Sequence, residues 1–331
     1  MKLLIDAFGG DNAPLAPLQG AVHAKSELGA DIVVVGPRAE IVACARQNNL
    51  DLDGIEIIDA PRVFSMEMEP TSIVKENNDT SLAIGLKALS AGDVDAFVSA
   101  GSTGALVVGA TLFVKRIHGV RRAAIGAILP TPNGPFLLLD AGANAECTAE
   151  MLEHFAVLGS IYAQNVLGIA SPSVGLANIG SEPTKGDPLR VETYARLREN
   201  KNIRFTGNVE ARDIPKGDVN VVVADGFTGN VILKLFEGVA SALMGMIKGI
   251  FKKNPITILG ALCVSGGLKG LKKQMDYSEH GGAPLLGING VVIKAHGSSD
   301  AKAFFNAARQ AKRCVEGDLA ENIRTALQRQ K

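Results

Sequence analysis

The chain has 331 residues with 34 basic and 34 acidic side chains, so its formal net charge is zero. Its composition, 47% hydrophobic and 21% charged, excludes a disordered or collagen-like chain and provides for a sizeable core. Because balanced charge creates no global basic field, we expect no nucleic-acid partner, and charged ligands must be bound by local patches.

Short aliphatic segments that are continuous in apolar character predict buried strands. In chain order they are residues 3–5, 32–35, 55–58, 96–99, 123–129, 136–139, 174–177, 203–205 and 219–223. Segments between them with apolar residues three and four positions apart predict helices. These are residues 15–28, 39–48, 81–90, 104–116, 148–165 and 188–199. The alternation predicts an α/β fold, a three-layer α/β/α arrangement with a largely parallel sheet.

Residues 129–135 read Leu-Pro-Thr-Pro-Asn-Gly-Pro, a connection too short for a crossover helix, and predict an antiparallel hairpin. No linker, low-complexity tract or internal repeat divides the chain, so we expect one two-lobed domain over residues 1–331. The four cysteines are far apart and no histidine has metal-ligand spacing, which favours a reduced cytoplasmic protein without a metal or other cofactor. We find no apolar run of the length that a membrane span needs.

Five of the expected strands end in glycine-rich polar segments: residues 6–11, 99–104, 140–144, 178–186 and 225–230. Because the carboxyl ends of parallel strands share one edge, we expect these loops to converge on one crevice. Glycine lets the backbone approach a ligand, and N–H groups that open a helix favour an anion. Any single segment is explained equally well as an ordinary tight turn. The candidate substrate-binding residues are Asp6, Gly9, Gly10, Ser102, Thr103, Gly104, Asn144, Asn178, Ser181, Glu182 and Asp225.

The usual nucleotide motifs are absent, since no Gly-x-Gly-x-x-Gly follows the first strand and no phosphate-binding P-loop occurs. Residues 100–104, Ala-Gly-Ser-Thr-Gly, differ in one position from the nucleophile elbow Gly-x-Ser-x-Gly. Ser102 is therefore a candidate covalent nucleophile, although we favour Ser102 and Thr103 as hydroxyl donors to an anion.

Three ionisable side chains in loops are further candidates. Lys185 follows Pro-Thr after a strand, where its ammonium could reach an oxyanion; the alternative is a solvated lysine. His280 stands in Glu-His-Gly-Gly, as an acid–base group or as a structural loop histidine. For His296 we favour a structural role at a helix start capped by Asp300 or Ser299.

The segment 234–273 holds seven lysines and one acidic residue, with apolar residues at helical spacing. This pattern predicts a basic amphipathic helical hairpin that contacts a membrane surface or an acidic partner. The alternative is a helix packed on the core or in a dimer interface, with solvated lysines. The candidate contact residues are Lys248, Lys252, Lys253, Ile258 and Leu262.

Six motifs taken together resemble those of the bacterial PlsX-type phosphate acyltransferases over almost the whole chain. They span residues 5–14, 99–105, 140–144, 178–186, 224–230 and 279–287. The resemblance implies transfer of an acyl group from acyl-[acyl carrier protein] to inorganic phosphate, giving acyl phosphate for phosphatidic acid synthesis. It also implies a fold similar to isocitrate and isopropylmalate dehydrogenases and phosphotransacetylases. A homodimer bound peripherally to the inner face of the cell membrane is expected.

The chemistry is compatible with this residue set, because phosphate is itself the nucleophile and no protein nucleophile is needed. The protein must position the reactants, stabilise an oxyanion and assist the leaving thiolate. Lys185 is the candidate counter-charge, Asn230 or Asn144 the oxyanion donor, and His280 the proton donor to the thiol. A phosphotransacetylase-like enzyme that uses acyl-coenzyme A is the nearest alternative. More distant ones are a dehydrogenase of the isopropylmalate type, whose metal and nicotinamide sites we do not find, and a membrane adaptor.

Overall fold

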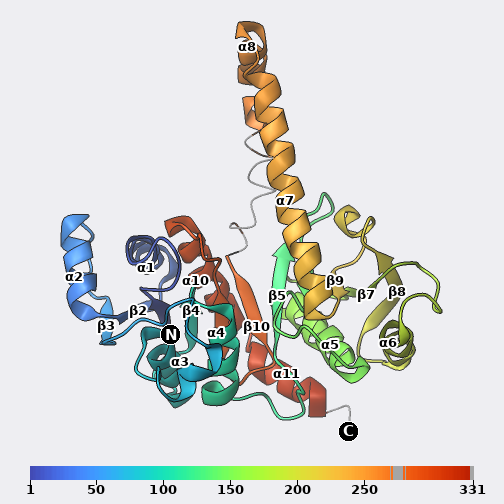
Figure 1. Ribbon diagram of the computed structural model, residues 1–331, viewed down its shortest axis with the longest axis horizontal. Helices are drawn as coiled ribbons and strands as arrows, with labels where there is room; N and C mark the ends of the chain where they lie inside the picture. The colour runs from blue at the N-terminus through green and yellow to red at the C-terminus, as the bar shows by residue number, and fades with distance from the viewer. Residues whose placement is uncertain (269, 271–278, 280, 329–331) are drawn as a thin grey trace.

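The computed structural model describes residues 1–268, 270, 279 and 281–328. Within them the strands form one 11-stranded sheet in the order β3-β2-β1-β4-β11-β10-β5-β6-β9-β7-β8 (Figure 1). The strands are β1 (Lys2–Asp6), β2 (Asp31–Gly36), β3 (Glu56–Asp59), β4 (Ala96–Ser99), β5 (Ala124–Leu129), β6 (Phe136–Leu139), β7 (Ser173–Asn178), β8 (Arg204–Glu210), β9 (Val221–Val223), β10 (Ala283–Leu286) and β11 (Val291–Lys294).

The helices connect these strands and include one that is much longer than the rest. They are α1 (Leu15–Leu28), α2 (Arg38–Gln47), α3 (Ser81–Ala91), α4 (Thr103–Gly109), α5 (Ala149–Asn165), α6 (Pro188–Glu199), α7 (Gly226–Phe251), α8 (Pro255–Cys263), α10 (Ala301–Glu316) and α11 (Leu319–Gln328). Short helical turns are η1 (Pro70–Val74), η2 (Ala110–Val114) and η3 (Ile214–Lys216).

Two hydrophobic cores lie on opposite faces of the sheet, because successive side chains of a strand point to opposite sides. In β1, for example, Leu3 and Ile5 belong to one core and Leu4 to the other. Helices α1, α5, α10 and α11 cover the first core, and α3 and α4 cover the second. The predicted three-layer α/β/α fold is therefore confirmed. The strands are mostly buried as expected, except β3 and β8 at the two ends of the sheet, which contain no buried residue.

The strand directions differ from the expectation of one shared edge. β4, β1, β2, β3 and β11 are mutually parallel, but β10 is antiparallel to both β11 and β5, and β5 is antiparallel to β6. β6, β9, β7 and β8 then run parallel to one another in the opposite direction to β4. The two strand sets therefore run in opposite directions, and β5 lies where the direction changes. The segments that follow β4, β6 and β9 nevertheless meet at one cavity, as expected, through residues such as Gly101, Gly142 and Asn230.

Most individual elements match the sequence predictions, and two strands were not predicted. The hairpin over 129–135 is confirmed by the antiparallel pairing of Leu129 with Phe136. The expected helix 104–116 consists of α4 followed by the π-helical turn η2. Strands β10 and β11 have four residues each, and β10 contains Pro284, a residue that usually argues against a central strand.

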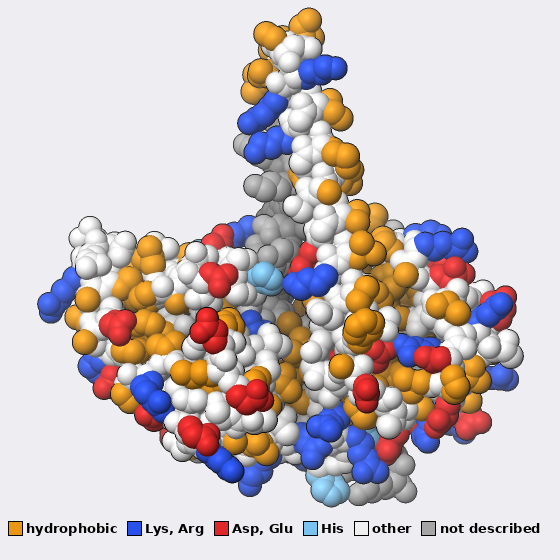
Figure 2. Space-filling model, viewed as in Figure 1, with side chains coloured by type: hydrophobic (Ala, Val, Ile, Leu, Met, Phe, Trp, Pro, Cys, Tyr) orange, Lys and Arg blue, Asp and Glu red, His pale blue; other side chains and the backbone are white. Residues whose placement is uncertain are grey.

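Helix α7 projects from the body of the protein and carries α8 at its far end (Figure 1). Only Gly226 and Gly229 of its 26 residues are buried. Apolar side chains along this projection are about half exposed or more, and lysines gather near its tip (Figure 2). They include Val231, Leu235, Val239, Leu243, Met246, Ile250, Ile256, Ile258, Leu259 and Leu262.

The structure thus shows α7 and α8 as the start of the predicted helical hairpin, while part of its second arm falls outside the described residues. Packing of α7 on the core of its own chain is limited to its N-terminal turns, so this part of the alternative interpretation is wrong. By length and composition alone, α7 also has the properties of a membrane-crossing helix, with a mean hydropathy of 1.5. The sequence pattern did not indicate a helix with membrane-crossing properties, because charged residues and glycines interrupt the apolar run.

Candidate active site

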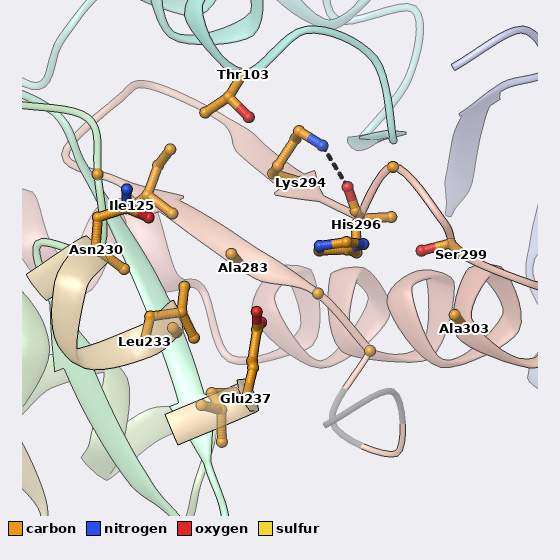
Figure 3. Close-up of a pocket in the computed structure, with 18 of the residues that line it drawn as sticks. Thr103, Ile125, Asn230, Leu233, Glu237, Ala283, Lys294, His296, Ser299 and Ala303 are labelled. Atoms are coloured by element: carbon orange, nitrogen blue, oxygen red, sulfur yellow. Dashed lines mark hydrogen bonds between the residues drawn. The ribbon is translucent and has the colours of Figure 1, made fainter. Parts of the chain in front are cut away.

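A cavity of about 430 Å³ lies along β5, between the loops that follow β4 and β11 and the N-terminal turns of α7 (Figure 3). Thr103, Lys294 and His296 occupy one side of it, and Asn230 and Leu233 the other. The remaining lining residues are Met66, Gly101, Ile125, Ala127, Ile128, Leu129, Ala141, Gly142, Lys234, Glu237, Gly281, Gly282, Ala283, Ala295, Gly297, Ser299 and Ala303. The cavity is thus polar at the β11 end and aliphatic along β5.

Asp6 supports the floor of this site without lining the cavity. Its carboxylate accepts hydrogen bonds from Ser99 Oγ at 2.8 Å and from the Phe8 amide at 3.1 Å. Burial raises the pKa of Asp6, although these hydrogen bonds oppose the change. A Cβ on Gly9 would lie 2.7 Å from the Gly101 amide nitrogen, so this position requires glycine. Gly10 approaches Gly297 in the same way, and the 6–11 loop thereby fixes the backbone next to the cavity.

The loop after β4 contributes Gly101 and Thr103 to the lining. Ser102 is the N-cap of α4, and its hydroxyl accepts a long hydrogen bond of 3.5 Å from the Ala105 amide. Gly104 packs against Pro70 instead of the cavity. Of the three candidate residues in this loop, the structure therefore directs Thr103 to the site and assigns Ser102 and Gly104 to the helix start.

The loop after β6 is organised by the buried carboxylate of Asp140. It accepts hydrogen bonds from the backbone amides of Ile125, Gly142, Ala143 and Asn144 and from the Asn144 side chain. The Asn144 Nδ2 also donates to Ala123 O at 2.8 Å, so its donors serve the loop and not the cavity. Burial raises the pKa of Asp140, a change that the hydrogen bonds oppose.

Asp225 begins α7 as its N-cap, accepting hydrogen bonds from the Thr228 amide at 2.9 Å and the Thr228 hydroxyl at 2.7 Å. It also forms an ion pair with Arg190 of α6. Burial acts to raise the pKa of Asp225, but the Thr228 hydrogen bonds and the Arg190 charge hold it below its ordinary value. A Cβ on Gly229 would lie 1.8 Å from Asp140 O, so only glycine lets α7 approach β6 this closely. This contact places the next residue, Asn230, at the cavity, where its amide has no hydrogen-bond partner among the described residues.

The loop 178–186 does not line the cavity. Asn178 stabilises the loop itself, donating from Nδ2 to Lys185 O at 3.0 Å. Ser181, Glu182 and Lys185 are exposed, and Glu182 O accepts a hydrogen bond from Asn208 at 2.8 Å. The loop leads into α6, whose Arg190 forms an ion pair with Asp225, and this contact connects the loop to the site.

Two residues of the cavity were missed or undervalued by the sequence analysis. Lys294 ends β11, and its Nζ donates to the carbonyl oxygens of Ala100, at 3.2 Å, and Ala295. Burial lowers its pKa to about 8. His296 lines the cavity as well, with Nδ1 2.9 Å from Ser298 Oγ, while the predicted cap of the next helix is Asp300. Partial burial and the Lys234 charge lower the pKa of His296.

His280, the candidate proton donor, lies outside the described residues, although its neighbours Gly281 and Gly282 line the cavity. No sequence pattern marked Lys294, because the short strand that positions it was not recognised.

The fold resembles that of solved phosphotransacetylases. The EutD phosphotransacetylase from Staphylococcus aureus matches with a TM-score of 0.64 at 18% identity, over 95% of this chain and 94% of its own. A branched-chain phosphotransacylase from Enterococcus faecalis V583 matches with a TM-score of 0.59 at 15% identity, over 95% and 99% of the two chains. At these identities the similarity shows the fold.

Similarity in sequence identifies the family to which the chain belongs. The family model described as fatty acid synthesis protein matches residues 1–322. A phosphate acyltransferase of Clostridium perfringens (strain SM101 / Type A) is 44% identical over 320 residues, covering 96% of this chain and 94% of that protein. One from Thermoanaerobacter pseudethanolicus is 45% identical over 329 residues, covering 99% and 98%. The chain therefore belongs to the fatty acid synthesis protein family, whose curated relatives are phosphate acyltransferases, and it is an acyltransferase.

Proposed function

We propose that the protein transfers a long-chain acyl group from acyl-[acyl carrier protein] to inorganic phosphate. The acyl phosphate product would feed phosphatidic acid and phospholipid synthesis. The observation that carries this proposal is the 44% identity over 96% of the chain to a phosphate acyltransferase. The cavity supports it, because it combines a cationic polar end with an aliphatic wall along β5.

In the proposed reaction a phosphate oxygen attacks the thioester carbonyl carbon, and a new C–O bond forms. The tetrahedral oxyanion then collapses, the C–S bond breaks, and the departing thiolate takes up a proton. Asn230 donates to the oxyanion from the α7 side, where its amide has no competing partner among the described residues. Phosphate itself is the nucleophile, so Ser102 is not required for covalent chemistry, in agreement with its position at the start of α4.

Lys185 and His280 are the two other residues that we propose to act in this reaction. Lys185 is exposed on a loop outside the cavity, and as a counter-charge it requires that loop to close toward the N-terminus of α7. His280 would supply the proton to the thiolate, next to the glycines that line the cavity.

We also propose that the protein is a cytoplasmic homodimer bound peripherally to the inner membrane face through the α7–α8 projection. Exposed apolar side chains such as Ile258 and Leu262 suit insertion, and Lys248, Lys252 and Lys253 suit anionic lipid or an acidic carrier protein. Residues of α7 up to Glu237 line the cavity, and Val239, Ala240 and Leu243 line a second pocket together with residues 130–132, 211, 214 and 215 of the body. The part of α7 beyond Leu243 measures about 12 Å, shorter than the ~30 Å hydrocarbon core, which favours lying on the membrane over spanning it.

The donor is tested by comparing kcat/KM for long-chain acyl-[acyl carrier protein] and for the corresponding acyl-coenzyme A at the same phosphate concentration. We expect the carrier-protein thioester to be strongly preferred. Preference for the coenzyme A thioester would instead support the phosphotransacetylase-like alternative, which the shared fold favours.

A further inference from the structure

Lys294 holds a partly buried positive charge that makes no direct ion pair with any described residue. Its Nζ donates to two neutral carbonyl oxygens, of Ala100 and Ala295, while the carboxylates of Asp6 and Asp11 attract it from beyond ion-pair distance. A partly buried charge without a directly bonded opposite charge is costly, and an anionic ligand would supply the missing partner.

The surroundings of Lys294 fit an anion. Of the other charged groups at the cavity, Lys234 and Glu237 pair with each other at 3.1 Å. Asp6 is hydrogen-bonded to Ser99 and Asp11 lies beside Gly297, and both carboxylates attract the ammonium without forming an ion pair with it. His296 completes the polar end, and partial burial lowers its pKa. The two carbonyls occupy two of the three ammonium donors and leave one N–H for a ligand.

We propose that Lys294 is the cation that binds the phosphate reactant in this cavity, with the Thr103 hydroxyl as a neighbouring donor. Both side chains lie on the same side of the cavity, opposite Asn230 and Leu233 (Figure 3). Phosphate bound there would stand across the cavity from the oxyanion donor, with room between them for the thioester carbonyl. The inference rests on the proposed function, since it names the group that holds one of its two substrates.

The same chemistry could bind a second source of phosphate, namely the phosphodiester in the prosthetic arm of a carrier-protein or coenzyme A donor. The KM values for phosphate and for the acyl donor distinguish these two sources. Replacing Lys294 by Met keeps the length of the side chain and removes the charge, and loss of one charge-assisted hydrogen bond weakens binding by about 10- to 100-fold. For Lys294→Met we expect the KM for inorganic phosphate to rise by this factor and the KM for the acyl donor to change less than threefold.

Lys201→Met is the matched control, because Lys201 is exposed in the turn after α6, away from the cavity. Its kinetics should equal those of the unmodified protein. A rise in the KM for the acyl donor alone would assign Lys294 to the donor's phosphodiester, and unchanged KM values for both substrates would remove it from binding altogether. Either result overturns the proposal.

A second measurement needs no variant and no acyl donor. Equilibrium dialysis of the unmodified protein with radiolabelled phosphate gives its Kd from pH 8 to pH 10, a range over which phosphate itself remains a dianion. Because the pKa of Lys294 is about 8, we expect the Kd to rise about fivefold from pH 8 to 9 and about tenfold more by pH 10. A Kd that is constant over this range, or no binding at pH 8, contradicts the assignment.

The dialysis result is independent of the donor. If phosphate binds with the expected pH dependence but no acyl phosphate forms from acyl-[acyl carrier protein], the proposed function fails and the phosphate site stands. If acyl phosphate forms while the Kd is independent of pH, the function stands and Lys294 is not the phosphate ligand.

Discussion

Lys294 should make the protein less stable when it is charged, and this cost can be measured directly. Burial lowers its pKa from 10.5 to about 8, so the unfolded state binds the proton more tightly than the folded state. The free energy of unfolding is therefore reduced below about pH 8, where Lys294 is charged, and it recovers as the pH rises toward 10.5. The difference between these pKa values corresponds to about 3 kcal/mol at low pH, of which about 2–3 kcal/mol is regained between pH 7 and 10.

The assay is urea denaturation of the unmodified protein and of Lys294→Met at pH 7 and pH 10, in buffer without phosphate. Titrating groups distant from Lys294 are present in both proteins, so their effects largely cancel in the comparison, whereas Asp6, Asp11 and Lys234 interact with the charge that the substitution removes. The unmodified protein should gain about 2–3 kcal/mol relative to the variant between the two pH values. A stability difference that is the same at pH 7 and pH 10 would show that Lys294 is not buried as a charged group. Adding phosphate at pH 7 should stabilise the unmodified protein much more than the variant.

Three further predictions concern turnover and membrane binding. Asn230→Ala should lower kcat by about 10²–10³, because the substitution removes a donor to the oxyanion. The thermal midpoint should stay unchanged, since the Asn230 amide makes no hydrogen bond with described residues. Full activity of this variant would exclude Asn230 from the site. Lys185→Ala should lower kcat by a similar factor if its loop closes over the site, whereas unchanged kinetics would identify a solvated lysine. Ile258→Glu and Leu262→Glu should each abolish flotation of the protein with anionic vesicles and leave its activity in solution intact. The control variant Leu112→Glu, which changes an exposed position outside the projection, should still float with the vesicles. If the unmodified protein stays unbound at low salt, the projection serves another contact.

The layered fold could be predicted because it depends on local patterns. Apolar runs such as residues 3–5 and 136–139 are buried on both sides, so their composition alone identifies them as strands. The reversal of strand direction was not predictable in this way. It depends on where β10 is inserted, between β11 and β5, and that is a long-range pairing of a short strand containing Pro284.

The candidate site was predicted in part for the same reason. Thr103 and Asn230 follow strand ends in recognisable glycine-rich segments, and both line the cavity. Asn144 has the same sequence context, but its amide is bound to Asp140 and Ala123, a contact that no local pattern indicates. Lys294 stands at the end of an unrecognised strand, and its role depends on partial burial and on the lack of a direct ion pair within the described chain.

The N-terminal end of α7 links the fold to the proposed chemistry. Asp225 caps the helix, Gly229 lets it approach β6, and Asn230 consequently faces the cavity. The same helix continues into the exposed projection and leads to α8, so the residues proposed to bind the membrane and those proposed to act on the thioester are connected through α7.

Whether phosphate is the acyl acceptor can be measured from the two products of the proposed reaction. The protein is incubated with long-chain acyl-[acyl carrier protein] and radiolabelled inorganic phosphate, and label extractable into organic solvent is followed together with free carrier protein. We predict that the two products appear in equal amounts and that neither forms when phosphate is omitted. Release of carrier protein at the same rate without phosphate, with no extractable label, would identify a thioesterase and contradict the account.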